Sequence, residues 1–376
     1  MSAPLTIVEV TGRLGIGGVE THVSQLARGL VQRGHRVILL AQGSGVYGEE
    51  AKAAGAELLI VPFDKLGLRE AIAALEARNI DLIHTHNYRA TRFGAPLARA
   101  IQRPYVMTVH GPRPWWKRAL FREWSDTVLT VSAADRDNVI GPLGLSADRV
   151  VVGFLGIDTE RFKPGLDALQ VRAEWGVPDD CPLILNVTRF THRKARPARA
   201  LIRALPLVRQ RISGARLVLV GEGDELDRLS EDARQFNRSQ GEQVVTVAGP
   251  RTDIPLVMNT GDAIVATATT AIESLSCATP TIAFGRTGYF GIVTPENFED
   301  SRAVCFADHG HLPAQITPTR LANDLTTLLD NPTAARQRAE AVRSVIARSY
   351  CVKGMVEQIE SVYRSVIQKS GREFGT

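Results

Sequence analysis

Two basic residues, Arg189 and Lys194, offer the most informative chemistry in the chain. They lie in LILNVTRFTHRKARP, residues 183–197, where an apolar run typical of a buried strand precedes a periodic segment, residues 198–208, that predicts a helix. We therefore expect both cations beyond the carboxyl end of a strand, where open α/β sheets bind their ligands. Two fixed positive charges there suit a diphosphate leaving group, on which negative charge grows during reaction. A solvated basic loop without a ligand is the alternative interpretation.

A glycine-rich turn, GRLGIGG, follows the first strand-like run. Gly15, Gly17 and Gly18 precede a helix expected to begin near Val19, so backbone N–H groups at its N-terminus offer an anion site. A dinucleotide fingerprint, Gly-x-Gly-x-x-Gly, fails because its last position holds Glu20, which disfavours a nicotinamide dehydrogenase. A turn without a ligand remains the alternative.

Two later segments repeat the pattern of strand, turn and helix. RLVLVGEGDELDRL places Gly221 and Gly223 at the turn. In DAIVATATTAIESLS a strand is expected to end near Thr267 and a helix to open near Thr270, with Glu273 in its first turn. Its carboxylate is a candidate to accept two hydrogen bonds from ribose hydroxyls. The alternative is that it only complements the helix dipole.

Histidines follow two neighbouring predicted strands. DLIHTHN places His84 and His86 on one face of a strand end, and TVHG places His110 directly after another strand. We interpret His84 as structural and assign His86 to the acceptor side. His110 faces the cleft expected between two domains, where it is a candidate to contact a sugar hydroxyl or to act as a general base. No carboxylate cluster accompanies these histidines, so no metal site is expected.

The elements that must position these residues alternate between strand-like and helix-like along most of the chain, which predicts parallel sheets joined by right-handed crossovers. Besides residues 198–208, the clearest helical patterns are residues 19–34, 70–78 and 91–101. The expected strands are TIVEV, HRVILLA, AELLIVP, DLIHTH, PYVMTVH, TVLTVS and RVVVGF, then PLILNVT, ARLVLVG, QVVTVAG, DAIVAT, TPTIAF and AVCFA.

A break in this alternation divides the chain. Residues 156–167 are polar and turn-rich and are interpreted as a linker, whereas residues 321–367 are expected to be helical with a break near Ser349. The predicted fold class is α/β, with two Rossmann-like doubly wound parallel-sheet domains facing across a cleft. Residues 1–157 would form the acceptor-side domain and residues 165–348 the nucleotide-sugar domain. Residues 349–376 would form a C-terminal helix that packs back on the first domain.

Composition sets only broad limits. The chain has 376 residues, 44% hydrophobic and 23% charged, as in ordinary globular enzymes. A net charge of +5 indicates an anionic partner, and nucleic acid, an acidic membrane surface and an anionic cofactor all fit. The four cysteines are far apart and favour a reducing compartment over a disulfide or zinc framework. With no secretory signal and no bilayer-spanning run, we expect a cytoplasmic protein or one attached at the membrane surface.

A tryptophan-rich segment, PRPWWKRALFREW at residues 112–124, raises the membrane possibility. On a helical wheel Trp115, Trp116 and Trp124 share one half, and Arg118 lies among the basic residues of the other. This pattern suits an interfacial helix at the inner face of the plasma membrane and implies a lipid-linked acceptor. The alternative is a connector packed on its own domain beside the acceptor.

Taken together, these segments resemble the family-4 retaining glycosyltransferases, which have the B-type glycosyltransferase fold. The resemblance rests on motifs in the family's usual order: GGVETHVSQLARGLVQRGHRV, DLIHTHN, TVHG, TVLTVS, GIDTERFKP, VTRFTHRKA, LVLVGEGDELDRL and ESLSCATPTIAF. It implies retaining, metal-independent transfer of a sugar from a nucleotide-diphosphate sugar to an unknown acceptor. It further implies UDP as the commoner nucleotide and no nucleic-acid partner.

The resemblance also implies roles for individual residues. Arg189 and Lys194 would clamp the donor diphosphate, Glu273 would hold the ribose, and His110 would contact the transferred sugar. The remaining donor-binding residues would be Gly17, Gly18, Gly221, Gly223, Thr269, Thr270 and Ala271.

The chain departs from the family pattern at a glutamate that usually lies eight residues before the one matched by Glu273. Val265 stands there, as in a subgroup that also carries GYFGIVTPENF, residues 288–298. The sugar must then be held by other groups, for which His110, the amides of residues 269–271 and the glycine loop at residues 285–291 are candidates. A nucleotide-sugar epimerase or hydrolase on the same fold, or a non-catalytic partner protein, are the alternatives. The joint presence of Arg189, Lys194 and Glu273 argues against the last.

Overall fold

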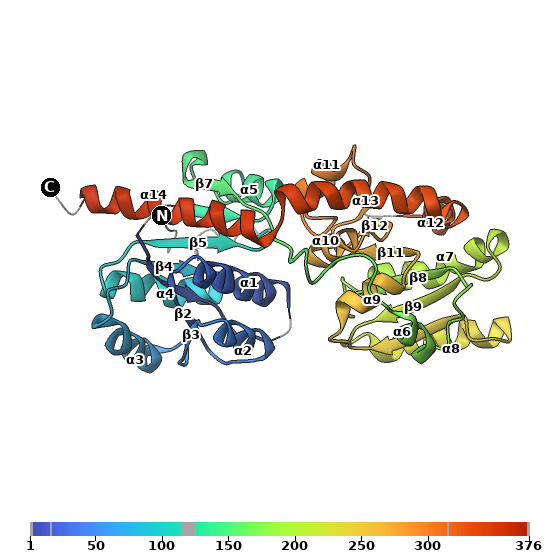
Figure 1. Cartoon of the computed structure of the whole chain (residues 1–376), viewed down its shortest axis with the longest axis horizontal. Coiled ribbons are helices and arrows are strands. Elements are labelled where there is room, and N and C mark those ends of the chain that lie inside the picture. The colour runs from blue at the N-terminus through green and yellow to red at the C-terminus, as the bar shows by residue number, and fades with distance from the viewer. Residues whose placement is uncertain (1–2, 16, 114–124, 126, 314–315, 374–376) are drawn as a thin grey trace. The chain divides into compact units, whose positions relative to one another are not determined.

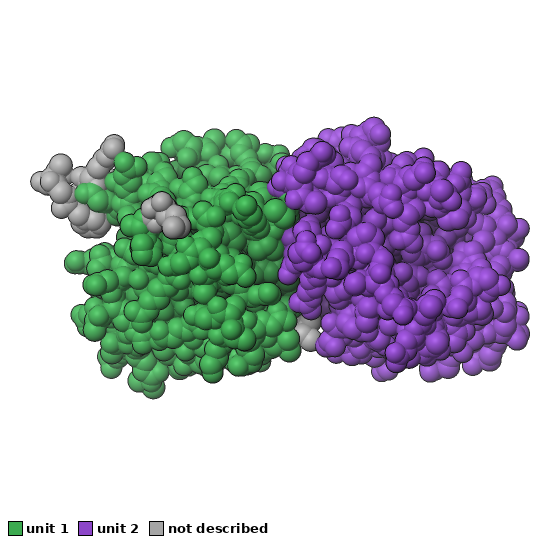
Figure 2. Space-filling view, viewed as in Figure 1, with its two compact units in different colours: residues 1–156, 350–376 green, residues 157–349 purple. Residues whose placement is uncertain are grey.

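The computed structural model describes residues 3–15, 17–113, 125, 127–313 and 316–373. The chain divides into two compact units: unit 1 is residues 1–156 with 350–376, and unit 2 is residues 157–349 (Figure 2). Each unit is an α/β domain built around its own sheet, so the prediction of two Rossmann-like α/β domains with parallel sheets is confirmed.

The sheet of unit 1 has seven parallel strands in the order β3-β2-β1-β4-β5-β6-β7. They are β1 (Thr6–Val10), β2 (Arg36–Ala41), β3 (Glu57–Ile60), β4 (Leu82–Thr85), β5 (Tyr105–Val109), β6 (Thr127–Thr130) and β7 (Val150–Val152). All seven lie in the segments predicted from apolar runs. Such continuous runs are typical of parallel strands that are buried on both faces.

The helices of unit 1 are α1 (Gly18–Gln32), α2 (Val46–Ala53), α3 (Lys65–Glu76), α4 (Tyr88–Ala100), α5 (Ala133–Ile140) and α14 (Val352–Glu373). Side-chain caps fix three of their starts. Asp64 accepts from the amides of Leu66 and Gly67 before α3, and Asn87 and Ser132 cap α4 and α5 in the same way. The cap at Asn87 matters for the site, because it sets the turn that follows His86.

Helix α14 belongs to unit 1, although it comes from the far end of the chain (Figure 1). It lies beside α1, where Gly29 leaves no room for a Cβ against Val356. Arg33 anchors the pair through a 2.6 Å ion pair with Glu360. This packing carries Tyr363 into the core of unit 1, where it is fully buried.

The sheet of unit 2 has the order β10-β9-β8-β11-β12-β13, parallel except for its last strand. Its strands are β8 (Leu183–Val187), β9 (Arg216–Val220), β10 (Val245–Gly249), β11 (Ala263–Ala266), β12 (Thr281–Phe284) and β13 (Tyr289–Ile292). Its helices are α6 (Leu169–Glu174), α7 (Arg196–Arg211), α8 (Leu226–Gln240), α9 (Ile254–Thr260), α10 (Ala268–Ser276), α11 (Phe298–Ala303), α12 (Pro318–Asp330) and α13 (Pro332–Ser349). None of the described helices is long and apolar enough to cross a membrane.

The edge of this sheet differs from the sequence prediction. The segment AVCFA is not a strand, because Cys305, Phe306 and Ala307 have φ values of 49°, 49° and 68°. Their backbone turns instead, and its carbonyl groups accept hydrogen bonds from the side chains of Thr267 and Thr287. The edge strand is β13, which pairs antiparallel with β12. A short apolar run does not reveal this difference, since periodicity alone cannot separate a buried strand from a buried turn.

Candidate active site

The basic loop after β8 places Arg189 and Lys194 at the carboxyl edge of the unit 2 sheet, as predicted. Two backbone hydrogen bonds fix this loop, from the amide of Thr188 to Val220 and from the amide of Phe190 to Glu222. Phe190 is fully buried, whereas Arg189 beside it is exposed and Lys194 is half-buried. Among the described residues neither cation has an ion-pair or hydrogen-bond partner at its charged group.

Other cations nearby are already engaged. Arg199 forms a 2.6 Å ion pair with Glu225, and Arg196 lies over the ring of Phe284 at 5.7 Å. Within the described residues, the local fold therefore leaves Arg189, Lys194 and the exposed Arg193 available for an anion, while it neutralises or stacks Arg199 and Arg196.

The glycines at 221 and 223 have a packing role that the sequence did not reveal. Gly221 and Gly223 have φ values of 149° and 147°. A Cβ on Gly221 would collide with the carbonyl oxygen of Thr188, and one on Gly223 would lie 2.6 Å from the carbonyl carbon of Phe190. Glycine at both positions lets the turn after β9 lie directly against the loop that carries Arg189. Direct contact of either glycine with a ligand stays a prediction.

Helix α10 begins earlier than predicted, and this changes the interpretation of Glu273. The helix starts at Ala268, not near Thr270, so Glu273 lies in its second turn and the first turn holds no acidic residue. The expectation that Glu273 lies in the first turn is therefore wrong. A dipole effect is confined to the terminal turn, so it no longer explains this carboxylate.

The first turn of α10 instead offers backbone donors. The amides of Thr269 and Thr270 lie among the first residues of a helix, which have no intrahelical acceptor. The side chain of the preceding Thr267 does not cap them, because its hydroxyl donates to the carbonyl of Phe306 at 2.7 Å. The amide of Ala271 already donates to the carbonyl of Thr267 at 3.4 Å, so Thr269 and Thr270 are the positions that suit an anionic or polar ligand group.

Glu273 is a partly buried carboxyl group in unit 2 with an unusual proton affinity. Burial raises its pKa to about 8, and the charge of Arg161 only partly opposes that rise. Its carboxyl group forms no side-chain hydrogen bond or ion pair within the described part of the chain. A ligand that donates hydrogen bonds would stabilise the ionised form, as ribose hydroxyls do. Val265, where the family usually has a second glutamate, is fully buried in β11.

The glycine turn of unit 1 places Gly17 and Gly18 at the start of α1, one residue before the predicted start. The carbonyl of Gly17 accepts hydrogen bonds from the amide and hydroxyl of Thr21, both at 2.9 Å. The carboxylate of Glu20 folds back so closely that a Cβ on Gly17 would collide with it. An acidic group thus already lies at this helix N-terminus, and phosphate contact by Gly17 and Gly18 stays a prediction.

A buried polar network crosses the carboxyl edge of the unit 1 sheet. Its first part joins Thr108 to Nε2 of His84 at 2.6 Å and Nδ1 of His84 to the hydroxyl of Tyr363, also at 2.6 Å. Tyr363 donates to Oε1 of Glu9 at 2.7 Å. On the other side of this carboxylate, Oε2 lies 2.5 Å from Nε2 of His86. The last link, from Nδ1 of His86 to Nε2 of His110, measures 3.3 Å.

Most proton directions in this network follow from Glu9, because an ionised carboxylate only accepts hydrogen bonds. Because the hydroxyl proton of Tyr363 goes to Glu9, the hydroxyl oxygen accepts from Nδ1 of His84, which also lies 3.1 Å from Oε2 of Glu9. The Nε2–H group of His86 donates to Glu9, so its Nδ1 accepts from Nε2 of His110. The remaining nitrogen of His110, Nδ1, then carries a lone pair and no proton. His110 is therefore an acceptor for a hydroxyl group.

The electrostatics agree with this assignment. Burial acts to raise the pKa of Glu9, but its interactions with His84 and His86 outweigh burial and hold that pKa well below the usual value. Burial lowers the pKa of His86 to about 4 and that of His110 well below its usual range. The carboxylate is thus ionised and these two imidazoles are neutral at pH 7.

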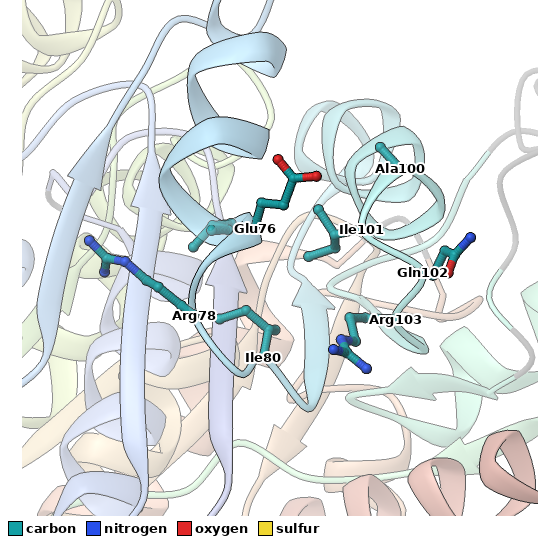
Figure 3. Close-up of a pocket in the computed structure, with 8 residues that line it drawn as sticks. Glu76, Arg78, Ile80, Ala100, Ile101, Gln102 and Arg103 are labelled. Carbon is teal, nitrogen blue, oxygen red and sulfur yellow. The ribbon is translucent and has the colours of Figure 1, made fainter.

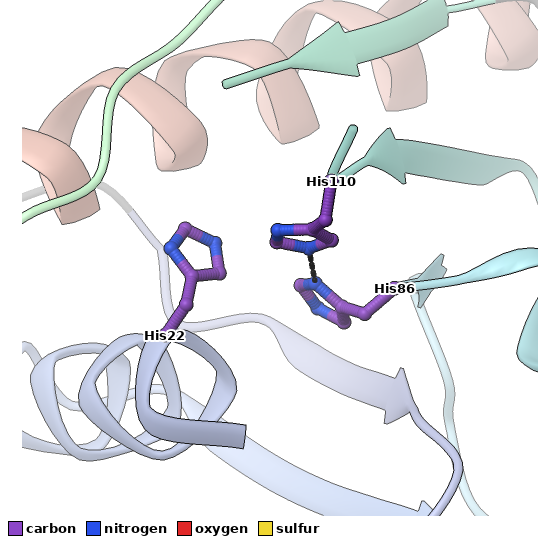
Figure 4. A group of neighbouring side chains, drawn as sticks. All are labelled: His22, His86 and His110. Carbon is purple, nitrogen blue, oxygen red and sulfur yellow. Dashed lines mark hydrogen bonds between the residues drawn. The ribbon is translucent and has the colours of Figure 1, made fainter. Parts of the chain in front are cut away.

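Four members of this region were missed from the sequence: Glu9, His22, Thr108 and Tyr363. Glu9 lies within the apolar run TIVEV, and a lone carboxylate in such a strand is itself a signal of a buried partner. His22 extends from α1 with its ring centre 5.0 Å from that of His110 and 5.7 Å from that of His86 (Figure 4). Tyr363 lies 279 residues from His84, a distance in sequence that no local motif spans.

Two further features lie outside this site. Trp115, Trp116 and Arg118 fall outside the described residues, so the membrane prediction for residues 112–124 stays a prediction.

A cavity of about 290 Å³ in unit 1 is lined by residues such as Glu76, Ile80 and Arg103 (Figure 3). It lies at the amino ends of β4 and β5, opposite the edge where parallel sheets bind ligands.

Comparison with known proteins identifies the family. The model "Glycosyltransferase Family 4" matches residues 16–161, and "Glycosyl transferases group 1" matches residues 167–345. The chain belongs to glycosyltransferase family 4. It is 28% identical over 244 residues to an uncharacterized glycosyltransferase of Methanocaldococcus jannaschii, covering 57% of this chain and 62% of that protein. The chain thus matches less than two thirds of that relative's length.

Two other similar proteins have more specific names. A GDP-mannose-dependent alpha-(1-6)-phosphatidylinositol monomannoside mannosyltransferase of Mycolicibacterium smegmatis is 30% identical over 263 residues, covering 64% of this chain and 66% of that protein. The crystal structure of Anabaena HepE in complex with UDP and glucose has a TM-score of 0.77 at 20% identity, covering 96% of this chain and all of that one. At this identity the likeness establishes the fold alone.

Proposed function

We propose that this family-4 member is a retaining glycosyltransferase that moves a sugar from a nucleotide-diphosphate sugar to an acceptor hydroxyl without a metal ion. The observation that carries the proposal is the pair of unengaged cations, Arg189 and Lys194, at the carboxyl edge of the same sheet as Glu273. A diphosphate needs positive charge, a ribose needs a hydrogen-bond acceptor, and unit 2 supplies both kinds of group.

The chemistry of transfer follows from these groups. The bond between the sugar's anomeric carbon and the leaving phosphate oxygen breaks, and a bond from that carbon to the acceptor oxygen forms on the same face. The acceptor proton moves to the leaving phosphate oxygen, so the products are a glycoside and a nucleoside diphosphate. Arg189 and Lys194 stabilise the charge that develops on the diphosphate, which is the task usually given to a metal ion.

His110 is assigned to the transferred sugar. Its unprotonated Nδ1 accepts a hydrogen bond from a sugar hydroxyl, and its Nε2 donates to His86, which Glu9 holds in turn. The network thus presents one fixed acceptor without any charge on the ring. This contact replaces part of the binding that a glutamate at position 265 would have supplied.

UDP is the nucleotide that we propose, and GDP is the second candidate. UDP occurs with glucose in the structurally similar HepE, whereas the mycobacterial relative is named for GDP-mannose. A thermal-shift screen of UDP- and GDP-sugars separates the two, because a ligand at a hundred times its dissociation constant stabilises the folded state by about 2.7 kcal/mol.

A lipid-linked acceptor is the further part of the proposal. It is supported by the tryptophan and arginine pattern of residues 112–124 and by the phosphatidylinositol mannoside in the name of the mycobacterial relative. Flotation with anionic vesicles tests it. Salt-sensitive binding would support peripheral contact at the inner face of a membrane, and its absence would remove the membrane idea.

Product analysis after treatment with EDTA tests the reaction itself. We expect nucleoside diphosphate to be released only with an acceptor present and the new glycoside to keep the donor's anomeric configuration. Release of free sugar without an acceptor would instead indicate a hydrolase, and an isomerised nucleotide sugar would indicate an epimerase. No turnover with any donor and acceptor pair, despite donor binding, would indicate a non-catalytic partner protein.

A further inference from the structure

Three imidazole rings of unit 1 converge on one point, and sugar transfer as proposed uses only one of them directly. His22 comes from α1, His86 follows β4 and His110 follows β5, and the three rings point toward one another (Figure 4). One ring nitrogen from each lies within 4.8 Å of the other two. Imidazole nitrogen is a preferred ligand of zinc and related divalent ions.

The spacing of His86 and His110 fits such an ion. Nδ1 of His86 and Nε2 of His110 are 3.3 Å apart. Two nitrogens bound at about 2.0–2.1 Å to a tetrahedral zinc ion lie about 3.3–3.4 Å from each other. The separation of these two nitrogens therefore already suits a tetrahedral ion once the proton on Nε2 of His110 has moved, and a ring nitrogen of His22 within 4.8 Å of both offers the third ligand.

His22 supplies an independent reason to place a ligand here. Its side chain is 4% exposed, and neither ring nitrogen has a hydrogen-bond partner among the described residues. Buried polar groups in native proteins are almost always satisfied, and an exception calls for a physical cause. A cation bound between the three rings would give one ring nitrogen of His22 a partner.

Glu9 and Tyr363 provide the support that metal-binding histidines usually have. Such a histidine commonly donates its second N–H group to a carboxylate, which fixes the ring and its tautomer. Here Nε2 of His86 donates to Glu9, and Tyr363 donates to the same carboxylate.

We propose that His22, His86 and His110 bind one zinc-class divalent ion, with a fourth position left for water, and that this ion inhibits sugar transfer. Binding releases no proton overall, because the proton on Nε2 of His110 moves through solvent to Nδ1. A neutral imidazole has one lone pair, so a metal-bound His110 has none left for a sugar hydroxyl, whichever nitrogen binds. The proposal of a metal-binding site does not depend on the proposed function, whereas the proposal of inhibition rests on it. His110 is partly exposed and offers the ion a route of access.

Cobalt binding to the EDTA-treated full chain tests the site. We expect one Co²⁺ per chain with the visible absorption of a tetrahedral ion, displaced by an equivalent of Zn²⁺. His22→Leu removes one ligand and breaks no hydrogen bond of the metal-free protein, so affinity should fall at least about tenfold. His110→Asn, at the partly exposed ring, should weaken binding in the same way. His311→Ala, at an exposed histidine of unit 2, is the matched control and should bind as the natural chain does.

Unchanged Co²⁺ affinity in folded His22→Leu and His110→Asn variants would overturn the site. For inhibition, each variant is compared with its own zinc-free turnover. We expect Zn²⁺ to inhibit the natural chain and His311→Ala at the same concentration, and His22→Leu only at concentrations at least about tenfold higher. Stoichiometric Zn²⁺ that leaves transfer unchanged would overturn inhibition. Turnover that requires Zn²⁺ would overturn both inhibition and metal-independent transfer, while the binding site itself would stand.

Discussion

The two sites differ in how they treat their polar groups. In unit 1, Glu9, His86 and Tyr363 are buried and bonded to one another before any ligand arrives. In unit 2, backbone hydrogen bonds fix the loop that carries Arg189 and Lys194, and the charged groups of both have no side-chain partner among the described residues. The first arrangement fixes a neutral acceptor, His110, in one tautomer. The second keeps positive charge in solvent until an anion neutralises it.

This difference predicts how substitutions in each site affect the free energy of unfolding. Disruption of a buried network leaves polar groups without partners, which lowers the free energy of unfolding. Removal of a partly exposed cation changes the free energy of unfolding little. We therefore expect substitutions in unit 1 to affect unfolding first and substitutions in the basic loop of unit 2 to affect turnover first.

The largest effect is expected from Glu9→Gln, which tests the first half of the comparison. A glutamine keeps the shape but loses the charge that accepts from both Tyr363 and His86, and hydrogen bonds to a charged group contribute about 1.5–3 kcal/mol each. The free energy of unfolding in urea should fall by about 3 kcal/mol or more. Glu231→Gln, at an exposed glutamate of α8, is the control and should leave unfolding almost unchanged. Equally small changes in the free energy of unfolding for both variants would show that the hydrogen bonds of Glu9 do not stabilise the fold.

Arg189→Ala and Lys194→Ala test the second half. Turnover should fall by roughly a hundredfold or more, because each cation stabilises charge that develops in the transition state. The free energy of unfolding should change by no more than about 0.5 kcal/mol. Arg193→Ala, an exposed arginine of the same loop, is the matched control for general loss of charge. Near-normal turnover of both Arg189→Ala and Lys194→Ala would place the diphosphate elsewhere.

The sequence revealed unit 2 better than unit 1 for a physical reason. Arg189 and Lys194 lie in a loop that directly follows a strand, so local pattern and position at the sheet edge predict them together. Tyr363 joins the site of unit 1 only because α14 packs beside α1, and this is tertiary information. Glu9 and His22 were overlooked because each lies within an element whose apolar pattern explained the segment without them.

The prediction for Glu273 was wrong because the sequence did not locate the first residue of its helix. All expected strands of both sheets were found except AVCFA, whose backbone has positive φ values at Cys305, Phe306 and Ala307. The start of α10 was placed two residues late, which assigned Glu273 to the wrong turn. Apolar periodicity locates an element but does not fix its first residue, because caps and neighbouring turns decide that.

Glu273→Gln is expected to have a smaller effect than the basic pair. If the carboxylate holds the ribose, the affinity for nucleotide should fall by roughly tenfold at pH 8.5, where the carboxyl group is largely ionised. Calorimetric titration should give the same loss for the bare nucleoside diphosphate and for the nucleotide sugar, because the contact is to the ribose. A loss confined to the nucleotide sugar would move Glu273 to the sugar and overturn the assignment.

The smallest effect is the pH dependence of that same contact. Because burial raises the pKa of Glu273 to about 8, the free protein holds a proton there at pH 7 that the unfolded chain has already lost. The free protein should lose stability through this group as pH rises from about 4.5 through 8, since ionisation of the buried carboxyl is disfavoured. Donor binding favours the ionised form, so affinity for a UDP-sugar should rise severalfold between pH 7 and 8.5, with proton release at pH 7. Calorimetry in two buffers of different ionisation enthalpy measures this release. Glu273→Gln should show neither the slope nor the release, and an equal slope in both proteins would assign the titration to another group.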